Sequence, residues 1–588
     1  MNRVTARFHQ LGLFLYQHRW AVIAGWVVLL GLGLWGAGQA AGVMKGGAAG
    51  IPNSGSARAE ALLSREFQNP YQRSFIVTVT SERFTLEDET LPQAVQELED
   101  AVAGMPNVLR TMSYNDRPEP IFRSEDGHRT FMMVGLKAEN HLDAEQNVVP
   151  MRERLAPVIA KWQQADPSFR AYVTGEIPIG FDGARVLAED TTTAEHRIFP
   201  LAVVFLLVVF GAVAAAGIPV LVGGAAAVLS LGLLYVFGHV MSLSALAQSI
   251  ASMVALGIGI DYSLIIVSRF REELAKGREV REAVAETTAH ACQAILYSGL
   301  TVMIGFLALF IPNLIDTNSL ALAGALTVLV AVLLATTLLP AVLGVLGRWV
   351  DWPFQLSRAV GSFKTDHLWY NWAREVMKHR VRYLVVGTLI MLAFSIPAFT
   401  VVFGQFSSKF LPPGMESGYG LVELEKMGQA GRLYPISVVV TAKDDTKVFT
   451  PAALKALAGV VTELRQEPVV EEVHSIVENA STLILMNNLF FNGDVKALRD
   501  RFPEAASLLI SADGTGTVVQ LIVKNDAGYG DIKAFTRSLQ QRDWSQTPGL
   551  ANFNVEVGGY AATNNDFEHA VLSALPKSSA KPSSISFL

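Results

Sequence analysis

The chain is 588 residues long, too long for one hydrophobic core, and only 17% of its residues are charged, compared with about 25% in typical soluble domains. The net charge of −6 argues against a nucleic-acid partner, which usually requires a basic surface. The single cysteine, Cys292, excludes an intramolecular disulfide framework and a cysteine metal cluster. The charge deficit is concentrated in long apolar runs, which predicts an integral membrane protein.

Seven apolar segments are long enough to cross a bilayer as helices. A helix needs roughly 20 apolar residues to cross a hydrocarbon core about 30 Å thick, because its backbone polar groups must bond within the segment. The predicted spans are Trp20–Ala41, Ile198–Ala216, Ile218–Phe237, Leu243–Ser268, Ala294–Ile311, Leu320–Leu346 and Tyr383–Phe403. The first has the basic flank of a signal peptide, but the number of later spans favours an uncleaved anchor.

Lysine and arginine are distributed unevenly between the predicted spans, and this bias sets membrane orientation. They gather in residues 1–19, in 269–281 after the fourth span, and in 347–382 between the sixth and seventh. All three stretches fall on one side if every apolar run crosses once, so that side is predicted to be cytoplasmic. The long segments 43–195 and 405–577 are then both outside the cytoplasmic membrane.

The two outer segments have the same order of predicted elements, β-α-β-β-α-β, which is the ferredoxin-like split βαβ pattern. The first contains strands Ser74–Thr80, Val108–Ser113, Thr130–Lys137 and Arg170–Thr174, and helices at 91–102 and Ala144–Gln163. The second contains strands Pro435–Thr441, Val470–Ser475, Thr517–Val523 and Asn552–Val557, and helices Pro451–Gln466 and Asp531–Gln541. The additional stretch Ala480–Ala512 is expected to add helices to the second copy. The chain therefore contains an internal repeat.

Asp261 is the only charged residue well inside a predicted span. An aspartate at a helix centre costs about 2.5 to 3.5 kcal/mol to insert, so such residues usually face a partner or a water-filled cavity. Desolvation favours the neutral acid, and a carboxyl at this depth suits a proton relay. The alternative is a structural carboxyl, permanently neutral or paired between helices. Gly257 and Gly259 precede it and permit another helix to approach closely.

Hydroxyls on neighbouring spans are candidate relay partners of Asp261. They are Ser298 and Thr301 in the fifth span and Thr336 and Thr337 in the sixth, although such hydroxyls often bond to their own helix backbone. The sequence contains no HExxH, GxSxG, Walker A or dinucleotide-binding motif. It therefore gives no support for an enzyme, an ATP-driven pump, a cofactor or a metal site.

The run GIGIDYSLIIVSRFREEL, residues 257–274, resembles the fourth-span signature of the MmpL branch of the RND (resistance–nodulation–division) transporter superfamily. The span layout, with a large outer domain after the first and seventh spans, is similar over essentially the whole chain. The resemblance implies export of lipids or other hydrophobic compounds driven by the proton-motive force. It assigns Asp261 and Tyr262 to a proton relay. Ser298, as a hydroxyl on the neighbouring fifth span, is a further candidate for this relay. A homo-oligomer or envelope partners are compatible with this plan.

This resemblance implies a definite order of domains along the chain. They are a cytoplasmic N-terminus (1–19), a first transmembrane helix (20–42), a first porter-like domain (43–195), five transmembrane helices resembling a sterol-sensing module (196–346), a cytoplasmic linker (347–382), a seventh helix (383–404), a second porter-like domain (405–577) and a polar tail (578–588). Family members have twelve spans and a second Asp-Tyr pair in the tenth. We therefore expect this chain to be the N-terminal portion of such a transporter.

Two other functions fit parts of this pattern. A non-transporting lipid-binding sensor or assembly protein would also use the sterol-sensing-like spans, and would bind lipid whether or not Asp261 is intact. Assistance in protein export, as in the accessory members of the superfamily, fits less well, because the two similar outer domains follow the MmpL plan.

Overall fold

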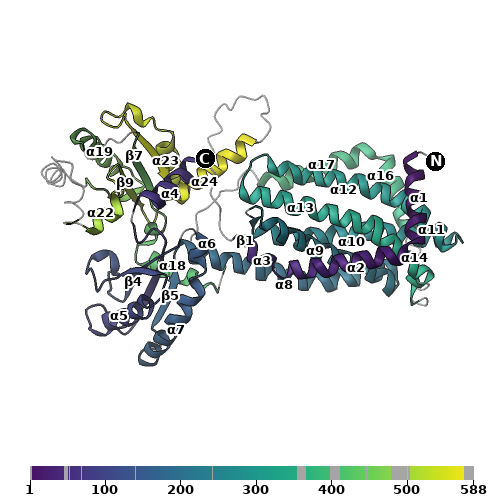
Figure 1. Ribbon diagram of the computed structural model, residues 1–588, viewed down its shortest axis with the longest axis horizontal. Coiled ribbons are helices and arrows are strands. Elements are labelled where there is room, and N and C mark those ends of the chain that lie inside the picture. Colours follow the sequence, from purple (N-terminus) through teal and green to yellow (C-terminus); the bar gives the residue numbers. More distant parts are fainter. Residues whose placement is uncertain are drawn as a thin grey trace. The chain divides into compact units, whose positions relative to one another are not determined.

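A computed structural model describes residues 3–45, 51, 53–67, 69–138, 141–241, 243–353, 366–397, 411–412, 414–443, 448, 450–477, 500 and 503–574. The chain divides into two compact units (Figure 1). The helical unit comprises Met1–Lys45 and Ala188–Phe403, and the α/β unit comprises Gly46–Leu187 and Gly404–Leu588. Each is considered by itself below.

The helical unit is a bundle in which α9, α10 and α13 pack against one another, with α2 against α9 and α12 against α13. Its elements are α1 Arg3–Gln17, α2 Arg19–Ala37, α3 Ala40–Val43, β1 Met44–Lys45, the later part of α8 Glu176–Phe210, α9 Val213–Gly238, β6 Leu243–Ser244, α10 Leu246–Ala275, α11 Val280–Thr287, the π-helix η2 Thr288–Cys292, α12 Gln293–Leu307, η3 Ala308–Phe310, α13 Ile315–Leu333, the π-helix η4 Leu334–Leu338, α14 Leu339–Leu346, η5 Gly347–Asp351, α16 Asp366–Lys378 and α17 Arg380–Ser395.

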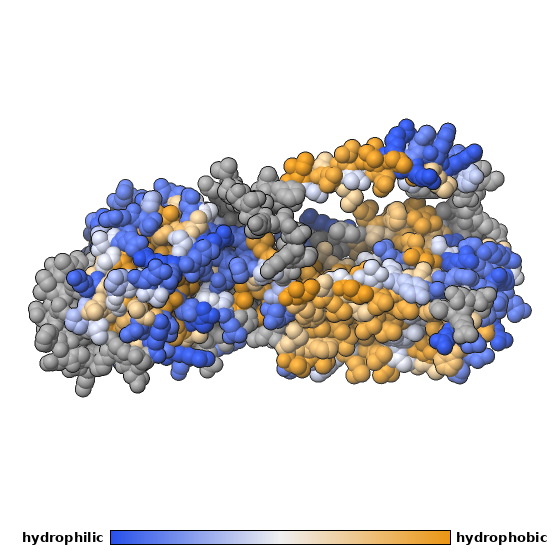
Figure 2. Space-filling view, turned by 90° about the horizontal axis from the view of Figure 1, so that it is seen from above, coloured by the Kyte–Doolittle hydropathy of each residue, from blue (hydrophilic) through white to orange (hydrophobic). Residues whose placement is uncertain are grey.

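Among the described residues, five helical segments are long and apolar enough to cross a membrane: Arg19–Ala37, Val213–Gly238, Leu246–Ala275, Val280–Phe310 and Ile315–Asp351. They correspond to the predicted spans one and three to six. The predicted second span contains only a shorter apolar helix, Phe199–Phe210, and the predicted seventh is described as α17, with residues 398–403 outside the described part. The helical unit presents a wide apolar surface, with polar residues gathered at the end that carries α1 (Figure 2). The protein is a multi-pass membrane protein.

The boundary between the predicted second and third spans was placed wrongly. Gly217 and Pro219 favour a break at that point, yet α9 continues through both residues. The break lies at Gly211, whose φ of 60° is accessible to glycine without strain. The amide of Gly211 donates to the carbonyl of Leu207 at 2.7 Å, which closes the end of α8.

Glycines allow the helices of this unit to meet at their backbones. A Cβ on Gly259 of α10 would lie 2.6 Å from the Cα of Gly223 on α9, and a Cβ on Gly232 of α9 would lie 2.7 Å from the Cα of Gly33 on α2. Such small-residue contacts are typical of membrane helix pairs, where the approach of backbones replaces the hydrophobic driving force. The prediction of close approach is confirmed for Gly259, whereas a Cβ on Gly257 would meet nothing within 4 Å.

The α/β unit contains two four-stranded antiparallel sheets (Figure 1). The first part contains α4 Gly55–Glu66, β2 Ser74–Thr80, α5 Thr90–Ala103, β3 Val108–Met112, η1 Pro120–Phe122, β4 Arg129–Leu136, α6 His141–Glu145, α7 Val148–Ala165, β5 Arg170–Thr174 and the start of α8. The second contains α18 Glu416–Lys426, η8 Ala430–Leu433, β7 Ile436–Ala442, α19 Pro451–Leu464, β8 Val470–His474, α22 Pro503–Leu509, β9 Gly516–Val523, α23 Tyr529–Gln541, η9 Trp544–Gln546, β10 Phe553–Gly558 and α24 Tyr560–Ala574.

The strand orders, β3-β4-β2-β5 and β8-β9-β7-β10, are the same for the two sheets. All eight predicted strands are present. Each sheet covers its own apolar core, built around Phe75 and Leu98 in the first half and around Val438 and Leu457 in the second. Of the additional stretch 480–512, α22 is described, and residues 478–499 lie outside the described part.

Two helices cross between the halves of the α/β unit. α4, from the first half, packs against β10, β7 and α24 of the second half, whereas α18, from the second half, packs against β5 and β2 of the first. The crossing is reciprocal and is fixed by matching bonds: the backbone amide and hydroxyl of Ser56 donate to Asp566, and those of Ser417 donate to Asp182. Asp182 and Asp566 each lie seven residues after a left-handed glycine, Gly175 or Gly559, so the repeat extends to these contacts.

Candidate functional site

The two residues of the predicted relay, Asp261 and Tyr262, lie halfway along α10 but have different surroundings. The side chain of Asp261 is exposed at the bundle surface, and none of the described residues forms a hydrogen bond or ion pair with it. Tyr262 is only 6% exposed and belongs to the main core of the unit. Consecutive residues of a helix point about 100° apart, so the buried phenol and the exposed carboxyl follow from their adjacency.

The phenol of Tyr262 reaches a gap between α12 and α13. A Cβ placed on Gly299 of α12 would lie 3.5 Å from the Tyr262 hydroxyl and 2.3 Å from Val332 on α13. The missing side chain of Gly299 therefore makes room for Val332 of α13, and the Tyr262 hydroxyl lies next to the same glycine. Gly299 was not among the residues selected from the sequence, although it directly follows Ser298.

The candidate hydroxyls divide into two groups. Thr301, Thr336 and Thr337 donate to the backbone carbonyls four residues earlier, at 2.9, 2.7 and 2.5 Å, and Thr337 also accepts from the indole of Trp26 at 3.0 Å. This is the backbone bonding expected of hydroxyls in membrane helices. Ser298 is exposed on α12, and no contact between it and Asp261 is found among the described residues.

Two buried hydroxyls, those of Ser230 and Thr327, were not predicted as candidates from the sequence. Ser230 on α9 and Thr327 on α13 are both fully buried, and neither hydroxyl has a hydrogen-bond partner among the described residues. A buried hydroxyl without a partner is costly. Their position inside predicted spans was the available signal, but without the fold nothing distinguished them from other serines and threonines.

Charged residues tie the helix ends together at the end of the bundle that carries α1. Arg271 donates from Nε to Asp351 of η5 at 2.6 Å and from Nη1 to the carbonyl of Phe210, the last residue of α8, at 2.9 Å. Cations at a helix C-terminus satisfy free carbonyls and favour the helix dipole. Glu273, only 1% exposed, pairs with Arg269 and Lys276. Arg271, one of the basic residues that set the predicted orientation, therefore also links α10 to the end of α8 and to η5.

The comparison with known families decides what this bundle belongs to. The profile of the MMPL family matches residues 48–382 and 409–579. The chain belongs to the MMPL family.

Two relatives of this MMPL-family chain illustrate its similarities. It is 26% identical over 579 residues to the mycolic acid-containing lipids exporter MmpL11 of Mycolicibacterium smegmatis, covering 96% of this chain and 56% of that protein. It is 30% identical over 355 residues to the trehalose monomycolate exporter MmpL3 of Mycobacterium tuberculosis, covering 55% of this chain and 36% of that protein. The chain spans about half the length of the curated relatives it matches, or less.

The fold has a counterpart among solved structures. The hedgehog release protein Disp from the water bear Hypsibius dujardini aligns with a TM-score of 0.56 and 14% identity, covering 97% of this chain and 81% of that chain. At this identity the likeness concerns the fold alone. The match to the MMPL family and the two MmpL relatives confirm the resemblance to the MmpL branch of the RND superfamily that the sequence suggested.

Proposed function

We propose that this chain is the N-terminal portion of a transporter in the cytoplasmic membrane that exports lipids or other hydrophobic compounds, driven by the proton-motive force. The observation that carries the proposal is the Asp261–Tyr262 pair on α10, within a chain that belongs to the MMPL family. The lipid substrates named for MmpL11 and MmpL3 support the substrate class. Membrane lipids and protons are the proposed partners.

Asp261 is the proposed proton-binding group of the relay. A proton that crosses the membrane contributes about 2.3 kcal/mol per 100 mV, and coupling this energy requires a titratable group at depth. The carboxyl lies at the bundle surface, so a further helix or a water path has access to it. The hydroxyl of Tyr262 lies next to Gly299 of α12, and Ser298, the residue before that glycine, is a weaker candidate for the relay.

The proposal that this chain is a portion of the transporter is supported by α17. None of the residues of α17, Arg380–Ser395, is buried, whereas α2, which precedes the first α/β half as α17 precedes the second, packs along α9. An apolar helix of which no residue is buried by the described part of the chain suits a protein whose remaining spans cover it. We propose that these spans come from the rest of the transporter.

The two halves of the α/β unit are the proposed porter domains, with ferredoxin-like folds, at 43–195 and 405–577. The reciprocal crossing of α4 and α18 joins them, so a displacement of one half pulls on a helix attached to the other. The domain boundaries predicted from the sequence for the membrane helices, the cytoplasmic linker and the polar tail stay predictions.

The experiment is gradient-dependent lipid export by the intact transporter that contains this sequence, in inverted membrane vesicles. We expect Asp261→Asn to reduce export at least a hundredfold and Asp261→Glu to retain part of it. Asp316→Asn, in the first turn of α13, is the matched control and should export normally. Export by Asp261→Asn at the normal rate would refute the relay. Lipid binding without any gradient-dependent export in the unaltered protein would favour the sensor function.

A further inference from the structure

The N-terminal helix α1 is docked tightly on the segment that follows α10. α1 packs against α11, η2 and α14. A Cβ on Gly12 would lie 2.7 Å from the Cα of Ala285, so α1 and α11 touch at their backbones. The hydroxyl of Thr5 donates to Gln293 at 3.3 Å. This contact brings His9 against a face of α11 that is about 270 residues away in sequence.

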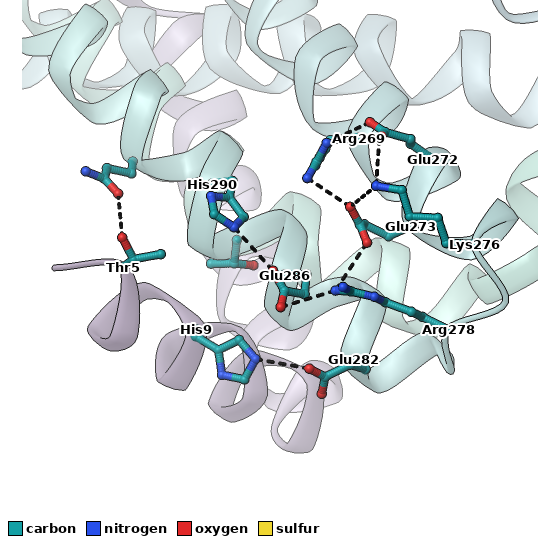
Figure 3. A network of polar contacts seen from close by, with 12 residues as sticks. Thr5, His9, Arg269, Glu272, Glu273, Lys276, Arg278, Glu282, Glu286 and His290 are labelled. Carbon is teal, nitrogen blue, oxygen red and sulfur yellow. Dashed lines mark hydrogen bonds and ion pairs between the residues drawn. The ribbon is translucent and has the colours of Figure 1, made fainter. Parts of the chain in front are cut away.

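The face of α11 that is turned toward His9 carries two carboxylates. Glu282 and Glu286 are four residues apart and therefore lie on the same side of the helix. One ligand atom of each of His9, Glu282 and Glu286 lies within 4.8 Å of the other two. Figure 3 shows the imidazole of His9 pointing from α1 toward Glu282, with Glu286 above it.

The imidazole–carboxylate distances in and beside this group are longer than those of strong hydrogen bonds. His9 Nε2 lies 3.3 Å from Glu282 Oε1, and His290 Nε2 lies 3.3 Å from Glu286 Oε2. A charge-assisted N–H···O bond is about 2.7–2.9 Å long. Two ligand atoms of a tetrahedral centre with bonds of about 2.0–2.1 Å stand about 3.3–3.4 Å apart. The His9–Glu282 separation thus matches one edge of a metal tetrahedron.

The negative charges of Glu282 and Glu286 are only partly compensated by the described basic side chains. Arg278 lies 3.2 Å from both Glu286 and Glu273, and Glu273 is further paired with Arg269 and Lys276. Within the described chain, neither lysine nor arginine forms an ion pair with Glu282, whose contact is His9. Among the described residues, the two carboxylates are therefore compensated by one arginine, which Glu286 shares with Glu273, and by one histidine each, His9 and His290. This arrangement leaves room for a divalent cation.

We propose that His9, Glu282 and Glu286 bind one divalent transition-metal ion of the zinc class, which joins α1 to α11. Imidazole nitrogen and carboxylate oxygen suit this class of ion, and three protein ligands with one water complete a tetrahedral centre. His290 is a positioning residue, because it holds Glu286 from one turn further along the chain. The inference does not depend on the proposed transport function.

The test is metal binding to the full chain, purified in detergent without a histidine tag and stripped of metal by a chelator. We expect one Zn²⁺ per chain, and Co²⁺ at the same site should give the intense visible absorption of a tetrahedral ion. His9→Ala and Glu282→Gln should each weaken binding at least tenfold, whereas His290→Ala should weaken it about tenfold and keep the stoichiometry of one.

His18→Ala is the matched control, because His18 is an exposed histidine between α1 and α2 whose imidazole bonds to the carbonyl of Phe14; this variant should bind Zn²⁺ normally. Thermal unfolding of each metal-free variant shows whether it remains folded, and Zn²⁺ should raise the melting temperature of the unaltered chain but not of His9→Ala. Absence of Zn²⁺ binding by the unaltered folded chain, or binding that is unchanged in His9→Ala and Glu282→Gln, would overturn the proposal.

Discussion

Tyr262 and Gly299 form a complementary pair on facing helices. A Cβ on Gly299 would touch the Tyr262 hydroxyl at the ordinary contact distance of 3.5 Å, and would overlap Val332 of α13 at 2.3 Å. Asp261, one residue earlier, remains exposed at the bundle surface. A structural and a chemical role are thus assigned to adjacent residues, and single-atom substitutions can separate them.

Tyr262→Phe removes only the phenol oxygen and keeps the buried ring. If the hydroxyl belongs to the relay, gradient-dependent export by the intact transporter should fall at least tenfold while the melting temperature changes little. Tyr297→Phe, at an exposed tyrosine of α12, is the control and should leave export unchanged. Equal export by Tyr262→Phe and the unaltered protein would restrict Tyr262 to packing.

Glu99 on α5 provides a pH dependence within the α/β unit. Burial, and to a lesser degree the nearby carboxylate of Asp116, raise the pKa of Glu99 from 4.5 to about 7, and its side chain is 4% exposed. The folded state then holds a proton that the unfolded state releases between these pH values. Stability of the first half should therefore fall as pH rises from about 4.5 to 7, by an upper limit of about 3 kcal/mol.

Glu99→Gln should abolish this contribution. The measurement is hydrogen exchange of the α5 amides in the full chain at a series of pH values, corrected for the intrinsic exchange rate. The difference between the unaltered chain and Glu99→Gln isolates this group from other titrating residues. A pH dependence that is identical in the two proteins would show that Glu99 does not titrate in this range.

The helix pair α9–α10 depends on contact between two glycines. Gly259→Ala would place a Cβ 2.6 Å from the Cα of Gly223, where only the backbone itself can yield. We expect it to destabilise the helical unit by about 1–3 kcal/mol, measured as a lower melting temperature in detergent. Gly257→Ala is the matched control, because a Cβ there meets nothing within 4 Å and alanine favours the helix. Equal effects of the two variants would contradict this packing.

The crossing helices of the α/β unit are held by unequal bonds. Asp182 accepts from Ser417 and also forms a two-pronged ion pair with Arg152 at 2.7 Å, whereas Asp566 accepts from Ser56 and from the amide of Gln540. Asp182→Ala would leave the half-buried Arg152 with one carboxylate, that of Glu416, and a long hydrogen bond to the carbonyl of Val173. We expect it to cost about 3–5 kcal/mol, against about 1–2 kcal/mol for Asp566→Ala.

Chemical denaturation of the full chain, followed by a fluorescence probe in each half of the α/β unit, measures both losses. A larger loss for Asp566→Ala than for Asp182→Ala would contradict the assigned role of Arg152.

At the scale of the whole molecule, local patterns predicted the fold where local interactions determine it. Helices such as α10 and strands such as β2 follow from apolar runs and alternation, which the sequence displays directly. The break at Gly211 was missed because Gly217 and Pro219 are stronger local signals, and the choice between them depends on tertiary contacts. One such contact is that of the Ala214 amide with the carbonyl of Trp352, 3.2 Å away.

Contacts between distant residues were not predictable from the sequence. Nothing local indicated that Ser417 bonds to Asp182, that Tyr262 faces Gly299, or that His9 meets Glu282, because each pair depends on how whole elements pack. Asp261 was identified because its signal is local: a charge within an apolar span. The candidate site was therefore recognised from one residue, while its surroundings required the fold.

Proton flux in proteoliposomes that contain the intact transporter and a pH-sensitive dye in the lumen tests the proposed role of Asp261 in proton coupling. With a proton gradient imposed, addition of a transported lipid should accelerate proton movement across the membrane. Asp261→Asn should abolish this lipid-dependent flux and Asp316→Asn should preserve it. A lipid-dependent flux of equal size in Asp261→Asn would contradict the account.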